Sequence, residues 1–137
     1  MRLAFALAFG LIAAFAAAPA TADEDPLAQY LWEARPVIVF ADSPRDPSFI
    51  RQMADFDRRK ADIEDRDVVL LTDTDPAAKG PLRRALHPRG FTIILIDKDG
   101  EIKLRRPRPM AVDALTRMID RTPLRQQEVD ERRKAGQ

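Results

Sequence analysis

Four segments of the chain have the hydrophobic patterns of β-strands. Three of them are dominated by Val, Ile and Leu, a composition typical of strands that are buried on both faces. The fourth alternates polar and apolar residues, which predicts a strand with one exposed face, and Asp-Lys-Asp-Gly at 97–100 predicts a hairpin turn ahead of it. The predicted strands cover residues 37–41, 67–72, 91–96 and 101–105.

Apolar residues at helical spacing lie between and after these strands. One stripe begins behind Asp46-Pro47, a pair that suits an N-cap and a first helical position. The stripe consists of Phe49, Met53, Phe56 and Ile63. Shorter patterns predict helices over 82–86 and 112–119. Residues 124–134 are mostly charged, so they form either a loosely docked helix or a tail.

The order of these elements, β-α-β-α-β-β-α, predicts an α/β fold. Strands that are connected through helices pair in parallel with right-handed crossovers, and the terminal hairpin adds an antiparallel edge. We therefore predict a thioredoxin-like fold, with a central mixed four-stranded sheet flanked by helices. A flavodoxin-like or ferredoxin-like layer is the alternative, and the terminal hairpin followed by one helix disfavours it.

The N-terminal end has the pattern of an export signal. Arg2 precedes an apolar stretch at 3–18, and Ala20-Thr21-Ala22 forms a small-x-small cleavage site. The apolar stretch is shorter than the ~20 residues of a membrane-spanning helix. We predict a signal peptide at 1–22, a thioredoxin-like domain at 23–123 and a charged C-terminal helix or tail at 124–137. The mature protein would be periplasmic or secreted, without a stable membrane span; an uncleaved anchor is the alternative.

The 137-residue sequence contains no Cys and one His. The absence of Cys excludes disulfides, thiolate metal sites and thiol nucleophiles. A single His without Cys partners also makes a metal site unexpected, so we predict neither a metal nor a cofactor. The formal net charge of +1 argues against a globally basic protein that binds nucleic acid.

The charge is nevertheless unevenly distributed, because residues 105–137 hold 9 basic and 5 acidic residues. Arg105, Arg106 and Arg108 form a basic cluster on the predicted edge strand and the segment after it. This cluster predicts binding to an unknown protein or an anionic envelope component, such as lipid head groups or a polyanionic glycan. The alternative is that charges and prolines protect the sheet edge from aggregation. No aromatic residue interleaves the cluster, so nucleic acid is not an expected partner.

The predicted turn between the first strand and the first long helix collects polar residues. Its candidate binding residues are Asp42, Ser43, Arg45 and Asp46. A helix N-terminus can stabilise an anion there, with Ser43 and Arg45 assisting; the alternative is that the turn only starts the helix. Tyr30 and Trp32 are expected to pack the N-terminal segment against the sheet, and the alternative is that they anchor a partner.

Several pieces of the chain resemble one family of domains. The pieces are Leu27, Tyr30, Trp32 and Arg35, the strand to Phe40, Asp65-Arg66-Asp67, the hairpin, and residues 123–128. They are similar to the thioredoxin-like, peroxiredoxin-like domain of unknown function of the P-DUDES type. That domain occurs in secreted bacterial proteins and in animal extracellular sushi-repeat proteins. The resemblance implies an extracellular or periplasmic interaction role.

The chain departs from active thioredoxins at both halves of their redox site. Their dithiol would fall at 42–46, and the proline that faces the dithiol would fall at Phe91. Without a thiolate, thiol–disulfide exchange and peroxide reduction are excluded. We therefore predict an exported, non-catalytic binding module without catalytic residues. The alternatives are an enzyme of unfamiliar type that uses the turn at 42–46, or a subunit of an envelope assembly.

Overall fold

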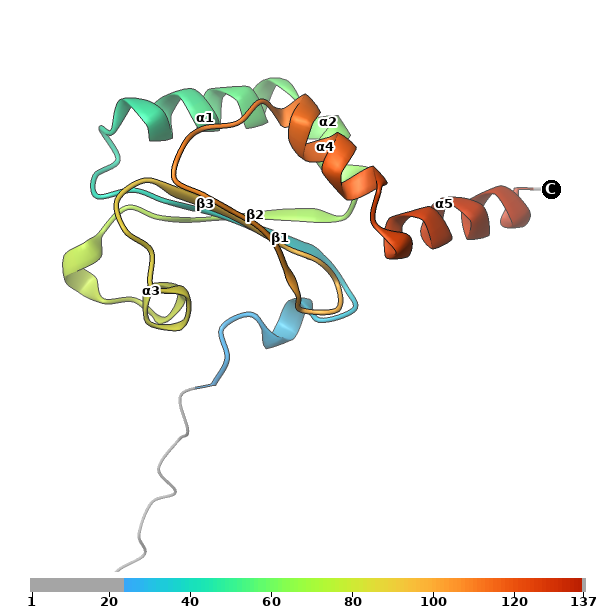
Figure 1. Ribbon diagram of the computed structural model, residues 1–137, viewed down its shortest axis with the longest axis horizontal. Helices are drawn as coiled ribbons and strands as arrows, with labels where there is room; N and C mark the ends of the chain where they lie inside the picture. The colour runs from blue at the N-terminus through green and yellow to red at the C-terminus, as the bar shows by residue number, and fades with distance from the viewer. Residues whose placement is uncertain (1–23, 137) are drawn as a thin grey trace, which may run out of the picture.

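The computed structural model describes residues 24–136, so the predicted signal peptide lies outside the described residues. A mixed four-stranded sheet with the strand order β2-β1-β3-β4 forms the centre of the molecule (Figure 1). Its strands are β1 (Arg35–Phe40), β2 (Val68–Asp73), β3 (Thr92–Ile96) and β4 (Ile102–Arg106). The α-helices are α1 (Pro47–Arg58), α2 (Lys60–Glu64), α3 (Pro81–Leu86), α4 (Val112–Asp120) and α5 (Pro123–Ala135).

The strand pairing confirms the predicted mixed four-stranded sheet, but the expectation that strands connected through helices pair in parallel is wrong for β3. The segment with α3 returns the chain to the same end of the sheet, where Asp73 ends β2 and Thr92 begins β3 beside Phe40. Strand β1 runs parallel to β2, and β3 runs antiparallel to both β1 and β4. The register of the last pair shifts between Leu95 and Ile96, which produces an irregularity in the hairpin. Every element of the predicted order is present, and the fold is a thioredoxin-like α/β fold.

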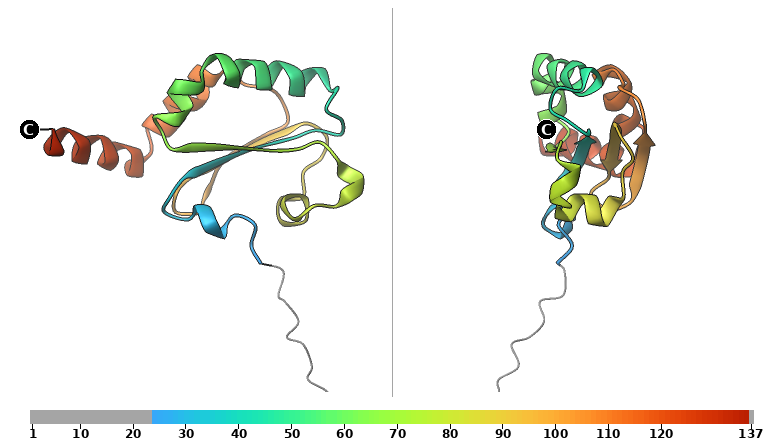
Figure 2. Two further views of the ribbon diagram at one scale, coloured as in Figure 1. Left: turned by 180° about the vertical axis from the view of Figure 1, so that it is seen from behind. Right: turned by 90° about the vertical axis from the view of Figure 1, so that its left-hand side faces the viewer.

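Helices cover both faces of the sheet, as two views of the ribbon show (Figure 2). Helices α1, α2 and α4 pack on one face, where Phe56 and Leu115 contact the core around Val37. Helix α3 packs on the other face, where Leu86 joins a cluster with Ile38. Because β1 lies between these two cores, all six of its residues are buried.

The first long helix is interrupted, which the hydrophobic stripe did not predict. Arg59 leaves helical geometry with φ −114° and ψ 25°, and its amide donates to the carbonyls of both Asp55 and Phe56. The chain then resumes as α2. Phe56 and Ile63 still reach the same core, so the stripe placed the buried residues correctly although the helix breaks between them.

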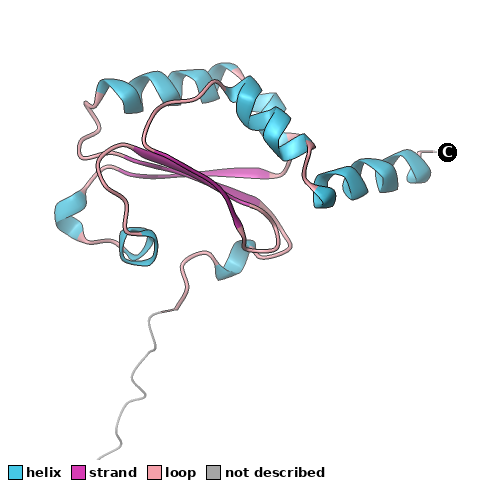
Figure 3. Ribbon diagram, in the orientation of Figure 1, coloured by secondary structure: helices cyan, strands magenta, loops and turns pink. Residues whose placement is uncertain are grey.

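The charged C-terminal segment forms a helix, α5, that projects beyond the sheet (Figure 3). Thr122 caps it, and its hydroxyl oxygen accepts from the Arg125 amide at 3.4 Å. Arg125 is buried, whereas residues 130–136 are exposed. The helix is therefore docked through its first turns. Within residues 24–136, no helix is long and apolar enough to cross a membrane.

Candidate functional site

The turn between β1 and α1 is held by short-range hydrogen bonds. The Asp46 carboxylate accepts from the amides of Ser48 at 2.8 Å and Phe49 at 3.4 Å, and so caps α1. The Ser43 hydroxyl oxygen accepts from the Arg45 amide at 3.1 Å. Asp42 and Arg45 have exposed side chains. The structure thus brings the four predicted residues into one turn, but Ser43 and Asp46 bind their own backbone rather than each other.

Arg83 of α3 occupies the space beside this turn, at the carboxyl ends of β1 and β2. Its guanidinium donates to the carbonyls of Ala41 at 3.0 Å and Asp73 at 3.2 Å, and Nε donates to the Asp73 carboxylate at 3.2 Å. The guanidinium also lies 5.4 Å from the centre of the Phe40 ring. Open α/β sheets bind ligands at the carboxyl ends of their strands, and here a side chain of the protein fills part of that position.

The segment ahead of β3 carries no cluster of reactive groups. His87 is exposed and adopts φ 47° at the C-terminus of α3. The Thr92 hydroxyl donates to the Arg89 carbonyl at 3.1 Å, and Phe91 packs against the core. Within residues 24–136, no three His, Cys, Asp or Glu side chains lie close enough to hold a metal ion.

The predicted basic cluster is divided between the two faces of the sheet. Arg105 pairs with Ile94 and donates to the carbonyl of Leu86 at 2.7 Å, which ties it to α3. Arg106 pairs with Ile93 and therefore points toward the side of α1 and α4. The structure thus separates Arg105 from Arg106, although Arg105, Arg106 and Arg108 are all exposed.

A hollow of about 350 Å³ lies between α1 and residues 109–111. The buried Gln52 holds this segment, because its side-chain amide donates to the Met110 carbonyl and its oxygen accepts from the Met110 amide, at 3.0 and 2.8 Å. Arg51 and Arg58 line the hollow, and Arg108 directly precedes Pro109 in its wall. We call Arg51, Arg58, Arg106 and Arg108 the basic surface.

One carboxylate lies within this hollow, but its charge is already engaged. The Asp55 carboxylate accepts hydrogen bonds from the Val112 amide at 2.8 Å and from Arg58 at 2.9 Å. Val112 is the first residue of α4, whose N-cap residue provides no side-chain hydrogen bond, so Asp55 satisfies an amide at the start of that helix. The hydrogen bond from Val112, and then that from Arg58, lower the pKa of Asp55. Arg58 remains exposed although it pairs with Asp55. The basic surface therefore keeps an excess of positive charge.

A buried ion network lies at the opposite end of the sheet, where β1 begins. The Arg35 side chain is only 1% exposed. Its Nε donates to Asp97 at 2.9 Å, Nη2 donates to Glu128 at 2.9 Å, and Nη1 donates to the Arg66 carbonyl at 3.0 Å. Lys98 also contacts Glu128 at 2.9 Å. Burial raises the pKa of Glu128, but hydrogen bonds from Arg35 and Lys98 outweigh it and lower that pKa to about 2.

The network continues along α5 and the loop before β2. Arg125 donates to the Asp65 carboxylate at 2.8 Å, and Arg66 binds Asp120 with two hydrogen bonds of 2.8 Å. Five cations and five carboxylates take part, and we call them the Arg35 network. Its members are Arg35, Arg66, Lys98, Arg125, Arg132, Asp65, Asp67, Asp97, Asp120 and Glu128. Positive and negative charges balance, so the network joins α5 to the sheet without an excess charge.

The comparisons with known proteins agree with this geometry. The family model of a domain of unknown function, DUF4174, matches residues 26–128, which include the whole sheet and the first half of α5. The chain belongs to the DUF4174 family. None of the curated proteins matches it.

Solved peroxiredoxins share the fold of this DUF4174 chain. The reduced 2-Cys peroxiredoxin of Plasmodium vivax is similar at 14% identity, over 69% of this chain and 80% of its own, with a TM-score of 0.56. Plasmodium yoelii Prx1a has 16% identity over 81% and 82% of the two chains, with a TM-score of 0.52. StoA of Bacillus subtilis has 14% identity over 62% and 81%, with a TM-score of 0.41. The predicted resemblance to a thioredoxin-like domain of unknown function without redox cysteines is thus confirmed.

Sequence reasoning did not identify the Arg35 network as a site in this DUF4174 chain. Its members come from segments that are far apart, and 93 positions separate Arg35 from Glu128. A signal was nevertheless present, because Arg35 stands directly ahead of a wholly apolar strand. A charged residue in that place, once buried, requires a partner.

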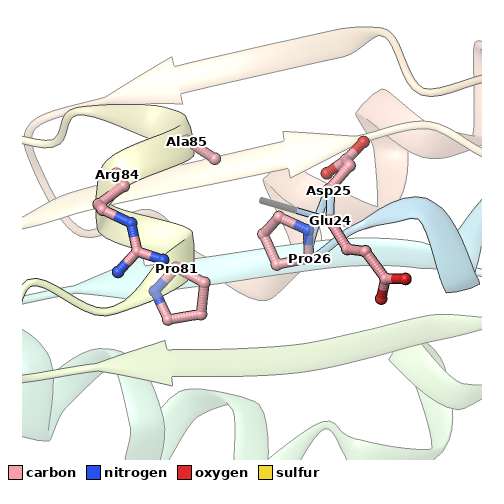
Figure 4. A pocket seen from close by; sticks show the side chains of 6 residues that line it. All are labelled: Glu24, Asp25, Pro26, Pro81, Arg84 and Ala85. Atoms are coloured by element: carbon pink, nitrogen blue, oxygen red, sulfur yellow. The ribbon is translucent and has the colours of Figure 1, made fainter. Parts of the chain in front are cut away.

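A second hollow, of about 240 Å³, lies between α3 and the start of the described chain (Figure 4). Pro81, Arg84 and Ala85 form one side, and residues 24–26 form the other. Arg84 donates to the Lys79 carbonyl at 2.7 Å. No buried polar side chain of the described residues lines this hollow, so it provides no built binding site.

Proposed function

We propose that this DUF4174 protein is an exported, non-catalytic binding module that holds an anionic partner on its basic surface. The single observation that supports this function is the hollow beside α1, which Arg51 and Arg58 line and whose one carboxylate, Asp55, is already engaged. Guanidinium groups bind carboxylates, phosphates and sulfates through paired hydrogen bonds, so these anions are the expected ligand groups.

The redox position of the fold offers no competing chemistry. The sequence has no Cys, and Asp46 and Ser43 are engaged in capping and turn formation. The proposed role therefore lies on a different surface from the redox turn, beside α1 and the segment that follows β4.

Binding to a sulfated polysaccharide tests the basic surface. We expect the double substitution R106E/R108E to elute from a heparin column at clearly lower salt than the unchanged protein. The matched control is R117E/R121E, because both arginines are exposed on or beside α4 and the change in net charge is the same. Equal shifts in the two variants would show that only net charge matters and would contradict the proposal.

Export is a separate part of the proposal and has its own test. The expected result is a periplasmic or secreted protein whose N-terminal residue is Asp23, measured by N-terminal sequencing of the protein recovered from its native host. A protein that keeps residues 1–22 and stays in the cytoplasm would contradict export without affecting the basic surface.

A further inference from the structure

Three large exposed hydrophobic residues lie in or against the β3–β4 hairpin: Leu31 and Trp32 contact its turn, and Ile102 begins β4. Leu31 is 46% exposed, Trp32 is 63% exposed and Ile102 is 49% exposed. Leu31 packs against the hairpin glycine, since a Cβ at Gly100 would lie 3.3 Å from the Leu31 Cδ1 atom. We call Leu31, Trp32 and Ile102 the Trp32 surface. The expectation that Trp32 packs against the sheet is wrong, because the structure directs its indole to solvent.

The backbone holds Trp32 in an unfavourable conformation. Its φ of 64° lies in the left-handed region, which bulky residues rarely adopt. The Trp32 amide donates to the Lys98 carbonyl at 2.7 Å, so a contact with the hairpin fixes this conformation. Packing does not explain the strain, because the side chain that it positions is largely exposed. Strain of this kind is concentrated at functional sites.

The surroundings of the Trp32 surface are acidic. Glu33 follows Trp32 along the chain, Asp99 lies in the hairpin turn and Asp25 lines the adjoining hollow. None of the three forms a salt bridge among residues 24–136, although Asp99 lies close enough to Lys103 to raise its pKa. Glu101 is neutralised by Lys103. A hollow of about 150 Å³ adjoins the surface, and its lining includes Tyr30, Leu31, Ile96 and Asp25. Apolar groups are therefore bordered by an excess of negative charge.

We propose that the Trp32 surface docks a cationic, partly apolar segment of a partner protein. A Lys or Arg side chain of that segment would stack on the indole, where cation–π attraction adds to the acidic rim, and an apolar side chain would enter the adjoining hollow. This inference does not rest on the basic surface, which has the opposite charge and lies beside α1. The sequence analysis named a subunit of an envelope assembly as an alternative function. The Trp32 surface would be a contact through which such a subunit binds its neighbour.

The fluorescence of Trp32 reports on this contact directly, because the chain has one Trp. The probe is a synthetic peptide of alternating Lys and Leu, and the control probe replaces Lys with Glu. We expect the Lys-Leu peptide to shift the emission to shorter wavelength in a saturable manner and the Glu-Leu peptide to leave it unchanged. No shift with the Lys-Leu peptide, or equal shifts with both peptides, would overturn the proposal.

Two substitutions that change the net charge equally distinguish an effect of the acidic residues around the Trp32 surface from an effect of the protein's net charge. Glu33→Lys should weaken binding of the Lys-Leu peptide by about tenfold, because it replaces an attractive charge at the rim with a repulsive one. Asp57→Lys makes the same charge change at an exposed position of α1 and should leave the affinity unchanged. Similar losses of affinity in both variants would show that only the net charge of the protein matters, and would contradict binding at the Trp32 surface.

Trp32→Gly distinguishes a binding role from a structural role. Glycine adopts positive φ without strain, so the variant should melt at an unchanged or higher temperature and yet lose binding of a fluorescently labelled Lys-Leu peptide. A lower melting temperature together with retained binding would show that the indole serves the fold, and the proposal would fail.

Discussion

The two ends of β1 are stabilised in different ways. At the carboxyl end, Ser43 and Asp46 bind amides only two or three positions away. At the amino end, Arg35 binds Asp97 and Glu128, which are 62 and 93 positions away. The turn at 42–46 is thus held by local hydrogen bonds, and Arg83 makes the long-range contact at this end of β1, to the Ala41 carbonyl. The amino end joins the sheet, the loop before β2 and α5, so its residues depend on one another.

Arg35→Met should cause the largest loss of stability, because the buried Asp97 would lose its cation and Glu128 would lose one of its cations. We expect the free energy of unfolding to fall by about 3–5 kcal/mol, measured by urea denaturation. Arg45→Met at the opposite end is the matched control and should change it by less than about 0.5 kcal/mol, because Arg45 is exposed. Similar losses of unfolding free energy in both variants would contradict the conclusion that the two ends of β1 are stabilised in different ways.

Glu128→Gln should change how stability depends on pH. Because the pKa of Glu128 is lowered to about 2 in the fold, its carboxylate stabilises the protein above its ordinary pKa of 4.5. That contribution, on the order of 3 kcal/mol, is lost as the pH falls from 4.5 to about 2. Urea denaturation of both proteins across this range should show the unchanged protein more stable at pH 7 and the difference disappearing near pH 2. A difference that is independent of pH would contradict this role of the charge.

Asp46→Ala should have a smaller effect, confined to the start of α1. Loss of the cap is expected to lower the free energy of unfolding by about 1 kcal/mol. Asp46→Asn should retain most of the stability that the cap provides, because the asparagine side-chain oxygen also accepts hydrogen bonds from helix amides. Ser43→Ala should cost less than about 0.5 kcal/mol, because its hydrogen bond lies in a partly exposed turn. Losses above 3 kcal/mol for any of these variants would mean that the turn is coupled to the core.

Most of the fold could be predicted because its signals are local. Three apolar runs and one alternating segment identified all four strands, and Asp46 marked the start of α1 correctly. The break at Arg59 escaped prediction, because the apolar stripe continues through it in register. The division of Arg105 from Arg106 follows from strand alternation, but it becomes visible only once each strand face is assigned to its covering helix.

The sequence by itself determined the order of strands and helices along the chain, the thioredoxin-like class and the absence of thiol chemistry, because period, turn residues and composition are properties of neighbouring positions. Only the tertiary structure decided that Arg35 and Glu128 meet, that Arg83 fills the space beside the redox turn and that Trp32 is exposed. These contacts join residues that are distant along the chain. Packing of the whole chain selects their partners, so the hydrophobic periodicity of a local segment does not predict them.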